Sequence, residues 1–197
     1  SRSKQELNNI NFTHHQVDVS DEILFHKFLS EINLDEIDNF ILSAGTNDIA
    51  LMKDITINRL EKLYRLNIYP AFNLLSKIST LKKEKTKAIV FITSIWSSTG
   101  IKGRAMYGSS KAALVSLSKH ASAELSQDSI FINCLSPGFT KTELSEKTQN
   151  DPLIKNALSR TSIKKMQETN SISESIMMLL VPHNKSITGQ EIFVDSG

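Results

Sequence analysis

A tyrosine and a lysine four residues apart, with a serine upstream, are the residues of this chain best suited to acid–base catalysis. Tyr107 and Lys111 belong to residues 105–127, where apolar side chains recur at helical spacing. Residues i and i+4 share one helix face, where a lysine ammonium lowers the pKa of a phenol from its ordinary value of about 10. Ser94 ends an apolar run typical of a buried strand, and its hydroxyl could polarise a substrate carbonyl. The tyrosine–lysine pair alone is weak evidence, because both residues are common on solvated helix faces.

The elements that must position these residues alternate between strand and helix along the chain. Apolar runs predict strands at residues 14–19, 38–43, 88–94, 130–135 and 191–194. Segments with helical periodicity predict helices near residues 21–31, 57–82, 105–127, 152–160 and 171–180. This alternation is typical of an α/β fold with a parallel sheet.

The second predicted helix should be kinked. Pro70 lies inside it, and proline has no N–H to donate to the carbonyl of Leu66. We therefore expect a bend beside Asn67. Asp54 or Thr56 could cap the first turn of this helix.

Length and composition limit the classes of protein to consider. The 197 residues suit a single domain, 1–197, and the net charge of +2 comes from 23 basic and 21 acidic residues spread along the chain. No basic stripe indicates nucleic acid, and no apolar run approaches the ~20 residues of a membrane span. We therefore expect a soluble cytoplasmic protein. Cys134, the single cysteine, is interpreted as a buried, inert thiol, and the five histidines show no spacing typical of a metal site.

Further motifs follow one another along the whole chain. They are Val17-Asp18-Val19, Ser43-Ala44-Gly45, Asn67, Ser94, Tyr107 with Lys111, Pro137-Gly138 with Thr142, and Ile187-Thr188-Gly189-Gln190 leading into Val194-Asp195. In this order and spacing they resemble the classical short-chain dehydrogenase/reductase family. The resemblance implies a three-layer, Rossmann-like, doubly wound parallel sheet that binds a nicotinamide dinucleotide.

The resemblance also assigns roles to four candidate catalytic residues. Ser94 would polarise the substrate carbonyl, and it is favoured over the serines that follow it because it stands at the end of the strand. Tyr107 would exchange a proton with the carbonyl oxygen. Lys111 would lower the pKa of that tyrosine and hydrogen-bond the nicotinamide ribose. Asn67 would hold, through its backbone carbonyl, a water that relays protons to the lysine; an ordinary polar helix residue is the alternative.

Ten residues would contact the cofactor by the same resemblance. They are Arg2, Asp18, Val19, Ala44, Gly45, Tyr107, Lys111, Pro137, Gly138 and Thr142. Arg2 would bind the 2′-phosphate, so NADP(H) is expected in preference to NAD(H). Asp18 would hydrogen-bond the adenine, but it fits equally well the start of a helix capped by Ser20. Leu42 and Ser43 stand where the family has two asparagines, which removes two side-chain hydrogen-bonding groups.

The start of the chain departs from the family. No glycine precedes Gly45, so the Gly-rich turn that binds the cofactor pyrophosphate is absent from this sequence. We expect that about one strand–helix–strand unit is missing and that the sequence is a piece of a longer protein. The strand expected at 14–19 would then have no partner, and the edge of the strand expected at 38–43 would be bare.

The expected activity is NADP(H)-dependent reduction of a ketone or 3-oxo group, or oxidation of the corresponding alcohol. The substrate loop would lie at 141–170, whose polar and basic character suits an anionic 3-oxoacyl thioester or a nucleotide-linked sugar, although an ordinary solvated loop explains it better. Helices 57–82 and 105–127 would pack across the two-fold axis of a homodimer or homotetramer. A non-catalytic relative that keeps the rear half of the fold and binds a partner protein is the alternative.

Overall fold

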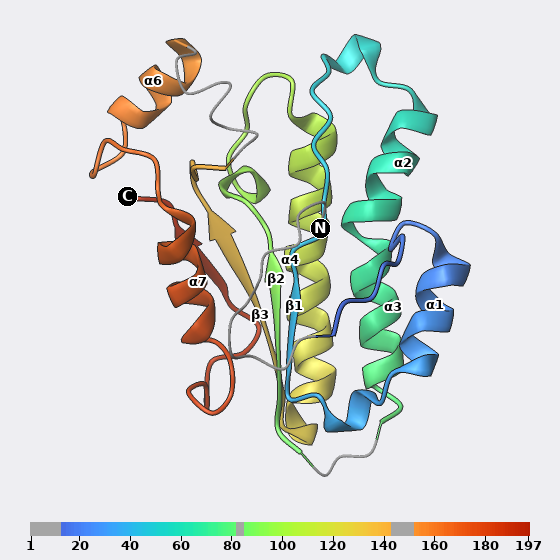
Figure 1. The fold of residues 1–197 in the computed structure, drawn as a ribbon. Coiled ribbons are helices and arrows are strands. Elements are labelled where there is room, and N and C mark those ends of the chain that lie inside the picture. Colours follow the sequence, from blue (N-terminus) through green and yellow to red (C-terminus); the bar gives the residue numbers. More distant parts are fainter. Residues whose placement is uncertain (1–12, 82–84, 143–151) are drawn as a thin grey trace.

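The computed structural model describes residues 13–81, 85–142 and 152–197, with the backbone alone for 152–154. Its centre is a parallel sheet of four strands in the order β1-β2-β3-β4 (Figure 1). The strands are β1 (Asn39–Leu42), β2 (Lys87–Ile92), β3 (Ile130–Pro137) and β4 (Glu191–Val194). Four of the five predicted strands are therefore present, and consecutive strands are neighbours in the sheet.

Six α-helices are present in the described part of the chain. They are α1 (Glu22–Glu31), α2 (Ile57–Asn67), α3 (Tyr69–Ile78), α4 (Ala105–Leu125), α6 (Pro152–Ser159) and α7 (Thr169–Met177). Helices α3 and α4 cover one face of the sheet and α7 covers the other, which confirms the predicted three layers (Figure 1). Among the described helices, none combines the length and the apolar character needed to cross a membrane.

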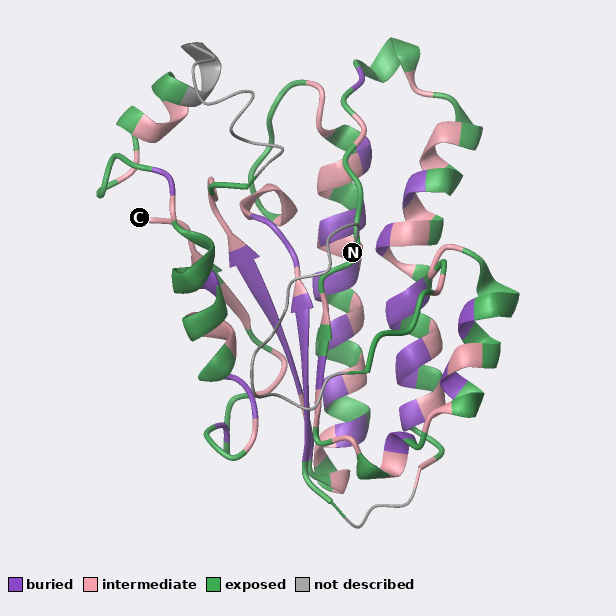
Figure 2. Cartoon of the chain, viewed as in Figure 1, coloured by how far each residue is buried: buried purple, intermediate pink, exposed green. Residues whose placement is uncertain are grey.

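Strand β2 reads as a continuous apolar run because helices cover both of its faces. Residues 88–91 are fully buried (Figure 2). Side chains alternate along the strand, so Ile89 and Phe91 pack toward α3 and α4, whereas Ala88 and Val90 pack on the α7 side. The sheet thus lies between two hydrophobic cores, one on each of its faces.

The leucines of α4 serve the protein's own core. Leu114 and Leu125 are buried in the cluster on the α3 and α4 side, and Leu117 packs against it. Cys134 belongs to the same cluster, where burial raises the pKa of its thiol to about 12. This confirms the interpretation of Cys134 as a buried, inert thiol. An oligomer formed through α2 and α4 stays a prediction.

The first predicted strand is wrong. Residues 14–19 form irregular backbone that ends in a turn. A strand needs a neighbour to complete its hydrogen bonds, and the described residues place none beside this segment. Val17 and Val19 nevertheless pack against the core, which accounts for the apolar character that suggested a strand.

The turn before α1 uses Asp18 as a structural acceptor. The Asp18 carboxylate accepts hydrogen bonds from the Ser20 backbone N–H at 2.9 Å and from the Ser20 hydroxyl at 2.7 Å. These bonds, the hydroxyl first, lower the pKa of Asp18. The expected cap is wrong, because Asp21 and not Ser20 accepts from the N–H of Leu24, at 3.0 Å. A contact between Asp18 and adenine stays a prediction.

The helix predicted at 57–82 is divided in two. Helix α2 ends at Asn67, and α3 carries Pro70 in its first turn, which confirms the expected bend. Of the two possible caps of α2, Thr56 is the one that accepts a hydrogen bond, from the N–H of Arg59 at 3.4 Å. The bend places Asn67 at the end of α2, where its side chain bonds to the loop after β1 and to α4.

A buried lysine fixes the segment that leads into β1. Lys87 is 2% exposed, and burial lowers the pKa of its ammonium. Its Nζ donates to the carbonyl oxygens of Leu34 at 3.0 Å, Asp35 at 3.0 Å and Ile37 at 2.7 Å. All three donors of the ammonium are therefore used by backbone acceptors.

Candidate active site

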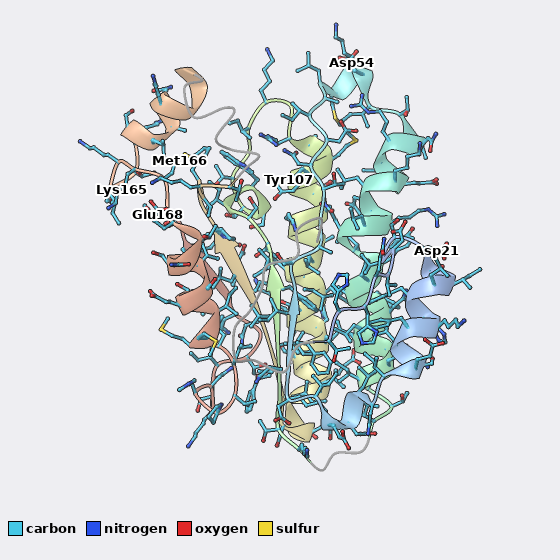
Figure 3. All side chains as sticks on the ribbon, viewed as in Figure 1. Asp21, Asp54, Tyr107, Lys165, Met166 and Glu168 are labelled. Carbon is cyan, nitrogen blue, oxygen red and sulfur yellow. The ribbon has the colours of Figure 1, made fainter. Side chains whose placement is uncertain are left out.

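Three of the catalytic candidates meet at the carboxyl end of β2. Ser94 follows the strand, and Tyr107 and Lys111 lie in the first half of α4. Figure 3 labels Tyr107 on this helix. The Ser94 hydroxyl lies close enough to the Tyr107 phenol to lower its pKa. The Nζ of Lys111 lies 5.7 Å from the centre of the tyrosine ring. A polarising hydroxyl, a phenol and an ammonium thus stand together where open parallel sheets bind ligands.

The Tyr107 phenol is a proton donor at neutral pH. Burial raises its pKa above the ordinary value of 10.0, and the nearby Ser94 hydroxyl and the positive charge of Arg104 oppose this. The expected lowering of the pKa by Lys111 is therefore wrong, because desolvation of the phenolate outweighs the nearby charges. A protonated phenol suits the donation of a proton to a carbonyl oxygen.

Lys111 is buried against the sheet. It is 4% exposed, and its Nζ donates to the carbonyl oxygen of Ile92, the last residue of β2, at 2.8 Å. Burial lowers the pKa of this ammonium to about 8, so it remains mostly protonated at neutral pH. The lysine therefore fixes α4 against the end of β2 and places a positive charge beneath the tyrosine.

Asn67 joins the loop after β1 to α4. It is 3% exposed, and its side chain accepts from the Thr46 N–H at 2.8 Å and donates to the Thr46 carbonyl at 3.0 Å. Its Nδ2 also donates to the hydroxyl of Ser110 at 2.9 Å. The sequence resemblance concerned the backbone carbonyl of Asn67, whereas the structure shows that its side chain positions the loop.

The cofactor candidates after β1 leave an open surface beside this site. Ala44 and Gly45 are exposed. A β-carbon on Gly45 would lie 3.3 Å from the Nζ of Lys111 and 3.4 Å from the Oδ1 of Asn67. A larger residue would press against both groups, so the glycine allows the loop to pass this close to them. This geometry fits a nicotinamide ribose, whereas Arg2 lies outside the described residues.

The cofactor candidates after β3 form a closely packed turn. Pro137 ends the strand, and the N–H of Gly138 donates to the carbonyl of Val194 at 2.9 Å. A β-carbon on Gly138 would approach the Cα of Asp195 to 2.8 Å, so only glycine allows β3 and β4 to lie this close at their ends. Thr142 is exposed at the far end of the same segment.

A carboxylate that the sequence did not reveal connects the two loops of the site. Glu191, at the start of β4, accepts hydrogen bonds from the hydroxyl of Ser97 and, at 2.6 Å, from that of Ser136. Ser97 belongs to the loop after Ser94, and Ser136 directly precedes the turn at Pro137. The contact joins residues 55 to 94 positions apart, so no local spacing could have predicted it.

Two further residues lie one turn from Tyr107 along α4. Ser110, three residues after it, holds Asn67, and Arg104, three residues before it, acts electrostatically on the phenol. Helical spacing alone could have identified both, because residues three apart are neighbours on a helix surface.

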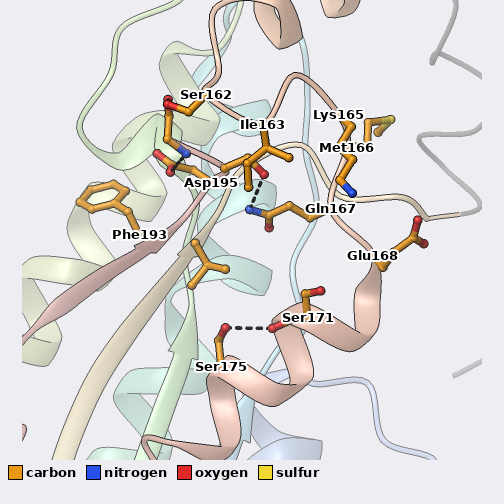
Figure 4. A pocket seen from close by; sticks show the side chains of 13 residues that line it. Ser162, Ile163, Lys165, Met166, Gln167, Glu168, Ser171, Ser175, Phe193 and Asp195 are labelled. Carbon is orange, nitrogen blue, oxygen red and sulfur yellow. Dashed lines mark hydrogen bonds between the residues drawn. The ribbon is translucent and has the colours of Figure 1, made fainter.

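Two hollows lie near these elements. One, of about 430 Å³, lies between α4 and the loop from Trp96 to Ile101. The other, of about 670 Å³, lies at the C-terminal segment beside α7, where the buried Oε1 of Gln167 has no hydrogen-bond partner among the described residues (Figure 4). Among the described residues that line the larger hollow, none is a catalytic candidate. The volume of a hollow therefore does not identify the active site.

The fold agrees with the comparison to known families. Residues 2–197 match the family described as enoyl-(acyl carrier protein) reductase. The chain belongs to the short-chain dehydrogenase/reductase family. Its relatives include a tropinone reductase homolog of Arabidopsis thaliana, 31% identical over 80% of this chain and 60% of the relative. A 3-oxoacyl-[acyl-carrier-protein] reductase of Chlamydia trachomatis is 29% identical over 86% of this chain and 68% of the relative.

Solved structures show the same fold. A 4-hydroxyisoleucine dehydrogenase complexed with NADH has a TM-score of 0.86 and 25% identity, over 93% of this chain and 77% of the other. ElxO with NADP bound has a TM-score of 0.84 and 26% identity, over 93% of this chain and 76% of the other. The chain thus spans about two thirds of the curated relatives, 60% and 68% of their lengths, and about three quarters of these structures.

Proposed function

We propose that this chain carries the catalytic residues of an NADP(H)-dependent reductase that converts a ketone or 3-oxo group into a secondary alcohol. The observation that carries the proposal is the placement of the Ser94 hydroxyl, the protonated Tyr107 phenol and the buried ammonium of Lys111 together at the carboxyl end of β2. Folding does not require a hydroxyl and a phenol placed together in this way at the end of a strand. The names of the relatives, which are reductases of carbonyl compounds, support the same reaction class.

The residues that would hold the cofactor surround this cluster. Gly45 and Lys111 would receive the nicotinamide ribose, and the turn at Gly138 would receive the carboxamide. When bound, the cofactor supplies the hydride. We propose NADP(H) in preference to NAD(H) because a guanidinium such as that of Arg2 suits a 2′-phosphate.

Each of the four candidate catalytic residues would then have one role. Ser94 donates a hydrogen bond to the substrate carbonyl oxygen and polarises it. Tyr107 donates its proton to the same oxygen as negative charge develops there. Lys111 holds a positive charge beneath the phenol and stabilises the phenolate that remains. Asn67 fixes the loop at Thr46, so that the surface beside Lys111 keeps its shape.

The test is the oxidation of NADPH by a panel of ketones, followed by its absorbance. The wild-type chain is used, together with any residues encoded upstream of it. Tyr107→Phe should lower kcat by about 100-fold or more, because the general acid is lost, with little change in melting temperature. Tyr69→Phe is the matched control, since Tyr69 lies on the surface of α3 at 39% exposure and should retain full activity. Normal turnover by Tyr107→Phe would contradict the proposal.

Nucleotide binding distinguishes the proposed reductase from the alternative, a non-catalytic protein that binds a partner. Melting temperatures are measured with NADPH, with NADH and with neither, for the 197-residue chain and for the chain with its upstream residues. Stabilisation by NADPH alone supports both the reductase and its preference for NADP(H). If neither nucleotide shifts the melting temperature of either version, a non-catalytic protein that binds a partner takes the place of the reductase.

A further inference from the structure

Arg104 lies one helical turn before the proposed acid. It is the N-cap residue of α4, and its side chain makes no capping hydrogen bond. Residues three apart lie on the same side of a helix, which directs Arg104 and Tyr107 toward a common region. The charge of Arg104 lowers the pKa of Tyr107, and Tyr107 in turn raises that of Arg104, so the two groups act on each other electrostatically.

The guanidinium of Arg104 is half-buried and unpaired within the described part of the chain. No ion pair or side-chain hydrogen bond of Arg104 is formed there. Burial lowers the pKa of this group. Arg59 shows the contrast, because its guanidinium donates to both carboxylate oxygens of Asp48 and this pairing raises its pKa. Removing a cation from water without a partner costs free energy, and an anionic ligand group would recover it.

The hollow beside Arg104 suits such a group. Arg104 is the one charged residue among the described residues that line it, and the others include the hydroxyls of Ser97, Ser98, Thr99 and Ser109. All of these hydroxyls except that of Thr99 already donate to other acceptors, so the guanidinium and Thr99 are the donors left for an oxyanion. Trp96 forms an apolar wall and contacts the ring of Phe139 edge-on at 6.1 Å between centres, which connects the hollow to the turn after β3.

We propose that Arg104 binds an oxyanion carried by the substrate and so selects ketones that bear a carboxylate or phosphate. This inference rests on the proposed reductase function. The carbonyl oxygen would lie at Ser94 and Tyr107, and the anionic group one helical turn away at Arg104. The guanidinium would therefore act as a specificity residue and not as an acid or base.

The test compares matched pairs of ketones that differ in charge. Acetoacetate is paired with its ethyl ester, and dihydroxyacetone phosphate with dihydroxyacetone, so that carboxylate and phosphate are tested separately. Wild-type enzyme should prefer the anion of at least one pair. Arg104→Gln should lower kcat/KM for that anion by about 10- to 100-fold and change the neutral partner by less than about threefold. Arg104→Lys should keep part of the preference, since it keeps the charge.

Lys102→Gln is the matched control, because it removes the same charge from an exposed position two residues away. It should leave the ratio of anion to neutral ketone unchanged. An equal loss for both members of a pair in Arg104→Gln, or a shift in its pH–rate profile alone, overturns the inference, because Arg104 would then act through Tyr107. Equal use of both members by the wild type also overturns it and leaves the reductase intact. Reduction of no ketone at all would refute the proposed function itself.

Discussion

Replacing Lys111 by methionine should stabilise the protein at neutral pH although it removes a catalytic candidate. Lys111 is 4% exposed, and burial lowers the pKa of its ammonium from 10.5 to about 8. The unfolded lysine holds its proton more tightly by about 2.5 pKa units, so burying the charge costs about 3 kcal/mol below pH 8. The hydrogen bond to Ile92, worth about 1 kcal/mol, is lost in Lys111→Met. A net gain of about 2 kcal/mol is expected at pH 7.

This gain should shrink as the pH rises. Between pH 8 and 10.5 the folded lysine releases its proton before the unfolded lysine does, so the stability of the wild type increases through this window. The raised pKa of Cys134, about 12 instead of 9.0, acts in the opposite direction above pH 9. The charge of Lys111 lowers the pKa of that thiol, but the folded thiol stays protonated up to pH 10 in both proteins, so its contribution cancels in the difference between their free energies of unfolding over this range.

Urea unfolding at pH 7, 8, 9 and 10 measures this difference. Lys119→Met is the control, because Lys119 is exposed on the same helix and its replacement should give no pH-dependent difference from the wild type. Equal m-values would show that the unfolded states are comparable. If Lys111→Met is less stable than the wild type at pH 7, or if its advantage does not change with pH, the assignment of an unfavourably buried ammonium is refuted.

Three other substitutions test how the site is held. Gly108→Ala places a β-carbon 2.8 Å from the carbonyl oxygen of Trp96, so the loop after Ser94 must move. We expect the free energy of unfolding to fall by about 1–3 kcal/mol in thermal melts. Because the loop carries Ser94, kcat should fall by about 100-fold in steady-state assays. Lys87→Met removes the donor of three carbonyls, one buried and two partly buried, and should cost about 3 kcal/mol in urea unfolding, opposite in sign to Lys111→Met. Glu191→Ala leaves two hydroxyls without their acceptor and should lower kcat by about tenfold, whereas Glu191→Gln, which keeps an acceptor oxygen, should lose less.

Much of the fold could be predicted from the sequence, because buried parallel strands are apolar along their whole length. Residues 88–91 are buried on both faces of the sheet, so they form an unbroken apolar run that is easily recognised. The bend beside Asn67 was equally predictable, since Pro70 cannot complete the hydrogen bonds of one continuous helix. In both cases the cause is local and lies within a few residues of its effect.

The incorrect predictions concern features that depend on distant partners. Residues 14–19 have an apolar pattern, but a strand exists only where a second backbone lies beside it. The bond between Glu191 and Ser136 forms because β3 and β4 are neighbours in the sheet, although 55 residues separate the two side chains in the sequence. The local spacing of residues in the sequence reveals neither the absence of a neighbouring strand nor this hydrogen bond.

The pKa of Tyr107 shows the same limit in energetic terms. Spacing identifies Lys111 as a neighbouring charge, and a neighbouring charge alone would lower the pKa of the phenol. The structure buries both groups, so desolvation raises the pKa of Tyr107 and lowers that of Lys111. Tyr107 therefore holds its proton at neutral pH, which is the state that the proposed reduction of a ketone requires. The charge of Arg104 opposes this rise, and an anion bound at Arg104 would neutralise that charge. A bound oxyanion would thus raise the pKa of Tyr107 further, so a change in this pKa would accompany the proposed binding at Arg104.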